Sequence, residues 1–519
     1  MATDADRPTD VVVVGGGHNA LVAAVELARA GRSVTVLERL DHVGGAAVSE
    51  RPWPEHDARL SRFSYLVSLF PQALVDSLGL DLELRSRDVA SYTPYEHADG
   101  TPDGLLVETV PGAATADAFR RLTGGDRELA AWTAFYADVQ QLAGAVEPTL
   151  LGPLPSVADL REGVDPSTWT DLVERPIGEA VRRRFTDDLV RGVVATDALI
   201  GTFASVDDPT LVQNRCFLYH LVGNGTGEWR VPVGGMGAVT TELARVARAA
   251  GADVRTGHVV RRVEPRDDGV TVTADGPDGE VVLEAVHVLS GVAPAVLAEL
   301  QGRRAVRPVG SQLKVNLLLS RLPRLRSGED PAVAFAGTFH VGESLTELEE
   351  AWADGADGRI GGGCGELYCH TLTDPTILGP ELAASGAHTL TYFGLHTPAP
   401  SLPDAAAGRA AYENFVAAFE RHLAEPLEPL LLGVEHKTPL DVEAALAMPG
   451  GHIFHGDLAW PWLDEDEQPA GPAERWGVAT DHERVLVCGS GSRRGGAVSG
   501  LGGHHAAQAL LELTSAPRG

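Results

Sequence analysis

The sequence predicts an α/β fold in which a Rossmann-like, nucleotide-binding domain is combined with a second domain of mixed α+β structure. The first observation is an apolar run, residues 10–14, that leads through a glycine turn into a helix. The second is the return of similar glycine-rich elements near residue 235 and near residue 495. The third is the length of 519 residues, which exceeds what one hydrophobic core usually supports. We therefore expect two or three closely packed domains.

The first glycine turn has the spacing of a dinucleotide-binding site. Gly15 permits a tight turn after the strand, Gly17 lets the backbone approach a phosphate, and Ala20 allows close packing of helix and strand. His18 and Asn19 open the helix. Since a helix N-terminus offers free N–H groups and a positive dipole, the turn predicts binding of a pyrophosphate.

The next strand, residues 33–38, ends in an acid that selects the type of dinucleotide. Glu38 lies 23 residues after Gly15, where a carboxylate can accept both hydroxyls of an adenosine ribose. An acid here disfavours a 2′-phosphate, which leaves NAD or FAD. Arg39 and a second glycine turn follow, and this combination favours FAD. The residues of the second turn expected to bind the cofactor are Gly44, Gly45 and Ala46.

Two later segments complete the expected nucleotide-binding domain. One begins with glycines at 234–237 and continues as a helix, a hairpin and an apolar strand that ends at residue 290. The other is a buried strand at 485–489, followed by a glycine loop and a C-terminal helix. A second helix N-terminus would thus approach the flavin end of a long cofactor. The cofactor-binding residues expected there are Gly489, Gly496 and Ser499.

These segments set the expected domain boundaries. Residues 1–70, 226–300 and 476–519 form a discontinuous FAD-binding domain. Residues 71–225 and 301–475 form the substrate-binding domain.

The substrate-binding domain is expected to contain both helices and strands. Its helical part lies mainly at 110–225, where apolar residues at helical spacing predict helices at 116–122, 127–146 and 177–199. An apolar run at 313–319 predicts a sheet strand.

Composition and charge exclude several classes of partner. The chain has 72 acidic and 42 basic residues and a net charge of −30, which repels the phosphate backbone of nucleic acids. Residues 1–6 lack the basic and apolar regions of a signal peptide, and no apolar run has membrane-spanning length. We therefore expect a cytoplasmic protein without nucleic-acid partners or a transmembrane segment. Peripheral membrane contact and a homodimer stay open.

The four cysteines are scattered, which indicates reduced thiols rather than a disulfide framework. Cys364 and Cys369 have the four-residue spacer of flavin disulfide reductases. Those enzymes place the pair just after the first nucleotide-binding element, so we interpret the spacing here as coincidence. The sequence suggests no metal ligands.

With these segments in place, the chain resembles the phytoene-desaturase-like flavoproteins, in particular the branch of pyridine nucleotide-disulfide oxidoreductase domain containing protein 2. The resemblance covers nearly the whole length. It implies one non-covalent FAD, a two-domain fold like that of amine oxidases and glutathione reductase, and an adenine contact through the backbone of Val260. It also implies desaturation, by hydride transfer to flavin N5, of a largely apolar, isoprenoid-like small molecule. The motifs that carry the resemblance are residues 15–19, 43–47, 61–66, 234–237, 438–441, 450–456, 488–489 and 495–496.

The same motifs imply candidates for substrate positioning and proton transfer, namely Arg62, His452, His455 and Asp457. Arg62 would clamp a flavin phosphate or support Glu38, and a structural salt bridge is the alternative. His455 would act in catalysis or simply cap a turn. Desaturation needs the substrate carbon about 3 to 3.5 Å from the flavin in a dry pocket. Electrons would then pass to an acceptor such as dioxygen or a quinone.

Two other functions stay open. A flavin amine oxidase would release hydrogen peroxide, and such enzymes often carry a lysine, linked through water to the flavin, soon after the strand at 286–290. The comparable residues 294–299 contain no lysine, which weakens this alternative. The second is a non-catalytic flavoprotein that acts through protein contacts.

Overall fold

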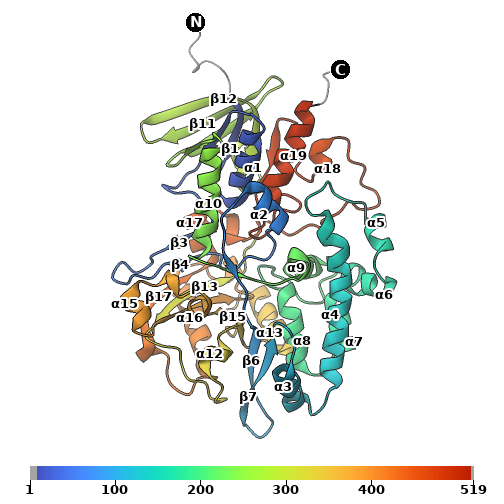
Figure 1. The fold of residues 1–519 in the computed structure, drawn as a ribbon, viewed down its shortest axis with the longest axis vertical. Coiled ribbons are helices and arrows are strands. Elements are labelled where there is room, and N and C mark those ends of the chain that lie inside the picture. Colours follow the sequence, from blue (N-terminus) through green and yellow to red (C-terminus); the bar gives the residue numbers. More distant parts are fainter. Residues whose placement is uncertain (1–8, 516–519) are drawn as a thin grey trace.

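The computed structural model of the chain describes residues 9–515. Residues 1–6, from which we infer that a signal peptide is lacking, lie outside the described residues. Two seven-stranded sheets organise the chain, one in each half of the view in Figure 1. No helix within residues 9–515 is both long and apolar enough to cross a membrane.

The first sheet assembles from three segments that are far apart in the sequence. β1 pairs in parallel with both β12 and β2, so that Val12 lies opposite Val288 on one side and Thr35 on the other. Its apolar residues are buried on both faces, as expected for a central parallel strand. The strands in order are β10 (Val259–Pro265), β11 (Val270–Gly276), β12 (Gly279–Ser290), β1 (Thr9–Val14), β2 (Val34–Leu37) and β9 (Asp253–Arg255), and β18 (Val485–Val487) pairs with β12.

Three helices pack against this sheet and against one another. They are α1 (His18–Arg29), α10 (Met236–Ala249) and α19 (Leu501–Ser515), drawn in blue, green and red in Figure 1. Their apolar residues share one core with β1 and β2. The first and last segments of the chain therefore lie side by side.

The second sheet is mixed, because β14 and β6 run parallel while the other neighbouring strands run antiparallel. All seven residues of β13 are buried, and this strand coincides with the run predicted at 313–319. The strands in order are β17 (Leu431–Lys437), β13 (Leu313–Leu319), β16 (His388–Gly394), β15 (Gly365–Tyr368), β14 (Thr338–Val341), β6 (Val89–Glu96) and β7 (Pro102–Glu108).

A layer of helices stands beside the second sheet, at the right of Figure 1. The helix predicted at 177–199 is divided in two, because Asp187 caps a new helix by accepting hydrogen bonds from the N–H groups of Leu189 and Val190. The prediction of one continuous helix was therefore wrong. The helices of this layer are α3 (Ala113–Thr123), α4 (Arg127–Val146), α7 (Ile177–Arg184), α8 (Asp188–Ala195) and α9 (Val212–Leu221).

Shorter elements connect these parts. The remaining strands are β3 (Ser49–Glu50), β4 (Leu60–Ser61), β5 (Leu84–Arg85) and β8 (Val231–Pro232). The remaining α-helices are α2 (Gln72–Leu78), α5 (Val157–Glu162), α6 (Pro166–Trp169), α11 (Pro294–Leu300), α12 (Pro331–Ala334), α13 (Leu345–Ala356), α14 (His370–Thr373), α15 (Pro380–Ala384), α16 (Ala405–Glu420), α17 (Pro439–Leu446) and α18 (Pro472–Arg475).

Candidate functional site

A cavity of about 410 Å³ is lined by residues of both sheets. At one end its wall consists of residues 14–20 and 37–40, which follow the carboxyl ends of β1 and β2. At the other end side chains from β13, β14, β15 and β16 line it. Open α/β sheets bind ligands at the carboxyl ends of their parallel strands, so this cavity is the candidate site.

The first glycine turn leaves space for a ligand at the start of α1. Gly15 has φ +91°, a conformation that favours glycine, and a hydrogen bond of 2.8 Å joins its N–H to the carbonyl of Leu37. Gly17 caps α1 and no side chain caps the helix. A Cβ on Gly17 would meet no atom within 4 Å. On the other side of the turn, a Cβ on Gly291 would lie 3.1 Å from the Cβ of Ala20, which explains the small residue there.

Glu38 is held in place by two backbone groups. Its buried carboxylate accepts hydrogen bonds from the N–H of Gly16 at 2.7 Å and from the N–H of Leu40 at 2.8 Å. Each carboxylate oxygen still has a lone pair available for a ribose hydroxyl. Arg39 and Val260 line the same end of the cavity, and Arg39 donates to the carbonyl of Ala445 at 2.6 Å.

The residues of the second glycine turn divide between two environments. Gly45 and Ala46 line the cavity. Gly44 does not, because it faces α10: a Cβ there would lie 2.8 Å from both Thr240 Oγ1 and Val48 Cγ1. Its N–H donates to the carbonyl of Gly16 at 2.8 Å. Gly44 thus supports the first turn from behind.

The third glycine element contributes a different set of residues from the one expected. Gly489 lines the cavity, and so do Ser490, Ala497 and Val498. Gly496 does not, since a Cβ there would lie 2.5 Å from Leu458 Cδ2, and Ser499 is buried with its hydroxyl accepting from the N–H of Leu501 at 3.3 Å. Ser499 therefore serves the start of α19.

His18 and Asn19 join the first turn to this third element. A hydrogen bond of 3.0 Å links His18 Nε2 to the carbonyl of Ala497, and burial lowers the pKa of His18 to about 4, so its ring is neutral. Asn19 donates to the carbonyl of Gly495 at 3.1 Å. Its buried Oδ1 has no hydrogen-bond partner among the described residues. An unpartnered buried acceptor is costly, so this oxygen fits a hydroxyl of a bound ligand.

These features together fit a bound FAD. The space at Gly17 suits a pyrophosphate, and the fixed carboxylate of Glu38 suits an adenosine ribose. The unpartnered Oδ1 of Asn19 suits a polar chain of the cofactor that runs from the pyrophosphate toward the second sheet.

Arg62 has contacts of its own away from the cavity wall. Its Nε lies 3.1 Å from both carboxylate oxygens of Glu435, and its Nη1 pairs with Glu50. Burial alone would lower the pKa of Arg62, but hydrogen bonds to Glu435 and Glu50 raise it well above its ordinary value. Of the roles that the sequence left open for Arg62, the structure shows the structural salt bridge.

Of the other three candidates, only His455 lines the cavity. His452 is buried outside the wall, where its Nδ1 accepts from the N–H of Phe454 at 3.3 Å and its Nε2 lies 3.8 Å from the exposed Asp457. His455 has φ +65°, and its Nδ1 has no partner among the described residues. Burial is the main cause that lowers the pKa of His455 to about 4, with smaller contributions from the neighbouring rings of His452 and His18, so this ring is neutral as well.

Lys314 lies in the cavity wall, and sequence reasoning missed it. It stands within the buried strand β13, its Nζ lies 3.3 Å from the ring centre of Tyr65, and this nitrogen has no hydrogen-bond partner among the described residues. Burial lowers the pKa of Lys314 well below its ordinary value, against the opposing charge of Glu435. A lysine inside a largely apolar run was the available signal. Residues 294–299, where the sequence shows no lysine, belong to α11.

The wall near Lys314 carries further ionisable groups beside apolar ones. Burial raises the pKa of Asp197 to about 7 and also raises that of Glu366, whose carboxylate accepts a hydrogen bond from Tyr368. Arg87 and His220 are further ionisable residues of the wall. Its apolar residues include Leu66, Ile200, Trp229, Phe393, Ile453 and Phe454.

Comparisons with known proteins identify the family of this chain. The family model described as "Flavin containing amine oxidoreductase" matches residues 21–351. Over 99% of each chain, the protein is 46% identical to an uncharacterized protein, Rv0897c, of Mycobacterium tuberculosis. It is 28% identical to pyridine nucleotide-disulfide oxidoreductase domain-containing protein 2 of Mus musculus, over 97% of this chain and 93% of the other. It is also 28% identical to phytoene dehydrogenase of Streptomyces griseus, over 73% and 72%. The resemblance inferred from the motifs is confirmed.

The fold is shared with solved structures. Putrescine oxidase bound to putrescine superimposes with a TM-score of 0.58 at 18% identity, over 98% of this chain and 99% of that one. The predicted fold class is therefore confirmed. The family match also establishes the cofactor class, because its members contain flavin. The chain belongs to the flavin-containing amine oxidoreductase family and is an FAD-dependent oxidoreductase.

Proposed function

We propose that this protein dehydrogenates a compact organic molecule at a carbon that bears an amine nitrogen, with a non-covalently bound FAD. A bound FAD supplies the hydride acceptor. The observation that carries the proposal is the buried, unpartnered amine of Lys314 in the wall of the cavity.

Lys314 is suited to hold the proton that leaves when a hydride is removed. Burial lowers the pKa of Lys314, which favours the form of the amine that can accept a proton at Nζ. The resulting ammonium would face the ring of Tyr65 at 3.3 Å, a contact that stabilises a cation. Glu435 lies close enough to favour the charged form as well. The strand β13 is buried over its whole length, so the amine is positioned without a flexible loop.

The ionisable wall favours an amine over a long hydrocarbon. A hydrocarbon in this cavity would leave the charged groups of Arg87 and Asp197 facing apolar atoms, which is costly in a site shielded from water. A substrate amine would instead give the Asp197 carboxyl a partner. This reasoning departs from the isoprenoid-like substrate that we expected from the sequence.

Non-covalent attachment is supported by the positions of the cysteines, which are one common anchor for covalent flavins. All four lie within the described residues, are buried, and stand outside the cavity wall. Acid precipitation of the purified protein is expected to release the yellow colour into the supernatant.

Desaturation of an apolar molecule is the second candidate. The apolar part of the wall, which includes Trp229, Phe393 and Phe454, supports it, as does the similarity to phytoene dehydrogenase. Lys314 would hold the proton in this reaction too.

Anaerobic mixing of the flavin-loaded protein with a panel of amines and a panel of isoprenoids separates the two candidates. Bleaching of the flavin by an amine, with an aldehyde or ketone and ammonia or a smaller amine as products, supports the proposal. Bleaching by isoprenoids alone, with the carbon skeleton intact, would replace it by desaturation. Repeating the reaction with dioxygen or a quinone then identifies the electron acceptor, since dioxygen yields hydrogen peroxide.

A further inference from the structure

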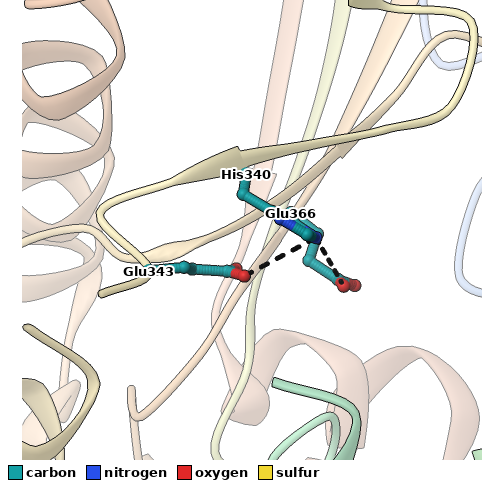
Figure 2. A group of neighbouring side chains, drawn as sticks. All are labelled: His340, Glu343 and Glu366. Carbon is teal, nitrogen blue, oxygen red and sulfur yellow. Dashed lines mark ion pairs between the residues drawn. The ribbon is translucent and has the colours of Figure 1, made fainter. Parts of the chain in front are cut away.

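Figure 2 shows three buried side chains that point toward one another, and one of them, Glu366, also lines the cavity. His340 belongs to β14, Glu343 follows that strand, and Glu366 belongs to the neighbouring β15. His340 and Glu366 are directly opposite in the antiparallel pair β14–β15, which brings them to one face of the sheet. The Nε2 of His340 lies 3.7 Å from Glu343 Oε2 and 3.8 Å from Glu366 Oε1. One ligand atom from each residue lies within 4.8 Å of the others.

The ring of His340 has a hydrogen-bond partner at its other nitrogen. Its Nδ1 lies 2.7 Å from Thr93 Oγ1, and when that nitrogen donates to the hydroxyl, the lone pair of Nε2 faces the two carboxylates. No hydrogen bond joins this ring nitrogen to either carboxylate at these distances.

Glu343 gives the second, independent observation. It is 1% exposed, and neither of its carboxylate oxygens has a hydrogen-bond partner among the described residues. Burying a carboxylate without partners is costly, because the group loses its hydrogen bonds to water and gains none in return. A bound cation would offset this cost.

We propose that His340, Glu343 and Glu366 bind one divalent transition-metal ion of the zinc type. One neutral imidazole and two carboxylates are ligands that such ions use, and they would balance its charge of two. Bonds of about 2.1 Å in a tetrahedral site place ligand atoms roughly 3.4 Å apart, so the two distances from His340 Nε2 need only a small contraction. The sequence suggested no ligands because the three residues come from two strands and a turn.

The position of Glu366 supplies a path for the ion. Glu366 lines the cavity, while His340 and Glu343 lie behind it, so an ion can enter from the cavity side. Its other oxygen, Oε2, accepts the hydrogen bond from Tyr368, which orients the carboxylate. A bound ion would thus anchor part of the cavity wall, whichever substrate reacts there.

The test uses the flavin-loaded protein, first purified without chelators and then stripped with a chelator. Elemental analysis is expected to find about one ion per chain, and zinc chloride added back to the stripped protein is expected to raise its Tm. Glu343→Gln should weaken zinc binding at least tenfold in calorimetric titration. Glu350→Gln, an exposed glutamate on the following helix α13, removes the same charge and should leave the affinity unchanged.

Two results would overturn the proposal. One is a stripped protein that binds neither Zn²⁺ nor Mn²⁺ and whose Tm ignores both, which would mean that the carboxyls are protonated instead. The other is equal metal affinity in the Glu343→Gln and Glu350→Gln proteins. If Glu343→Gln fails to fold, the absorption spectrum of Co²⁺ added to the stripped wild-type protein tests the proposal instead. Visible absorption bands of a tetrahedral or five-coordinate site with a nitrogen ligand support the cluster, and the spectrum of hydrated Co²⁺ contradicts it.

Discussion

Lys314 interrupts a strand whose other residues are almost all apolar, and its amine nitrogen faces an aromatic ring instead of water. Replacing Lys314 by Met keeps the length and apolar stem of the side chain but removes the amine. We expect the rate of flavin reduction by substrate to fall by about a hundredfold or more, the usual contribution of a positioned base. We also expect the protein to become more stable, by about 1 to 3 kcal/mol, because an unpartnered buried nitrogen is removed.

The other lysine of the chain offers a matched control. Lys437 pairs with Glu435 at 3.3 Å and stands outside the cavity wall. Lys437→Met should therefore leave the reduction rate near that of the wild type. Stopped-flow absorbance and thermal unfolding measure both effects. A Lys314→Met protein that reduces its flavin at the wild-type rate would remove Lys314 from the reaction.

Gly17 allows a test of the cofactor position at the level of one methyl group. Its φ of −70° and ψ of 169° are open to any residue, and a Cβ there would touch no protein atom within 4 Å. Gly17→Ala should therefore fold normally, whereas the methyl group should block close approach of a pyrophosphate. The expected result is a flavin content at least tenfold lower at equal Tm of the apoproteins, measured by absorbance and thermal unfolding.

Gly125→Ala is the control for this variant, because a Cβ on Gly125 also meets nothing within 4 Å and Gly125 lies far from the cavity wall. It should bind FAD like the wild type. Normal flavin content in Gly17→Ala would mean that the phosphates lie elsewhere.

At the scale of elements, a hydrogen bond between His504 and Glu26 links the first helix to the last. His504 of α19 lies 2.7 Å from Glu26 Oε1 of α1 through Nδ1 and 3.0 Å from the carbonyl of Leu151 through Nε2. Both ring nitrogens can donate at once only when the imidazole is protonated. Burial alone would lower the pKa of His504, but the hydrogen bond and charge of Glu26 raise it above its ordinary value of 6.5.

This raised pKa predicts a pH-dependent link between α1 and α19. A raised pKa in the folded state means that the stabilisation is complete below the unfolded pKa and is lost as the pH rises through the folded pKa. We expect wild-type stability to fall above pH 6.5 by about 1 to 2 kcal/mol relative to His504→Gln. Urea unfolding across this pH range measures the difference.

Glu26→Gln should abolish the same pH dependence, and the double variant should add nothing further, because the two residues act as a pair. If the pH dependence of stability survives in His504→Gln, a group other than His504 causes it.

At the scale of the whole molecule, the cavity joins residues of the two sheets, so the cofactor should stabilise both halves together. FAD in excess is expected to raise the stability by about 2.7 kcal/mol when its concentration is a hundred times the dissociation constant. FMN lacks the adenosine that Glu38 is positioned to bind and should give a smaller shift. Thermal unfolding of the apoprotein with each flavin compares them. Equal shifts from both flavins would contradict the assignment of the Glu38 end to adenosine.

Local features of the fold and site were predictable because they depend on neighbours in the sequence. The tight turn at Gly15 needs a positive φ, and that need is visible as a glycine after an apolar strand. The buried strand at 313–319 was predictable because a run of apolar residues must be covered on both faces. The helix at 177–199 was only partly predictable, since apolar spacing continues across the break while the capping acid, Asp187, ends it.

The sequence by itself determined the nucleotide-binding turns, the fold class and the flavin cofactor, because each depends on residues a few positions apart. Only the tertiary structure decided which distant residues meet. It placed Lys314 in the cavity, committed Arg62 to Glu435 and Glu50, and left Gly496 and Ser499 outside the wall. It also brought His340, Glu343 and Glu366 together. Which distant residues come into contact depends on strand order and register across the whole chain, and the spacing of residues within a segment does not carry that information.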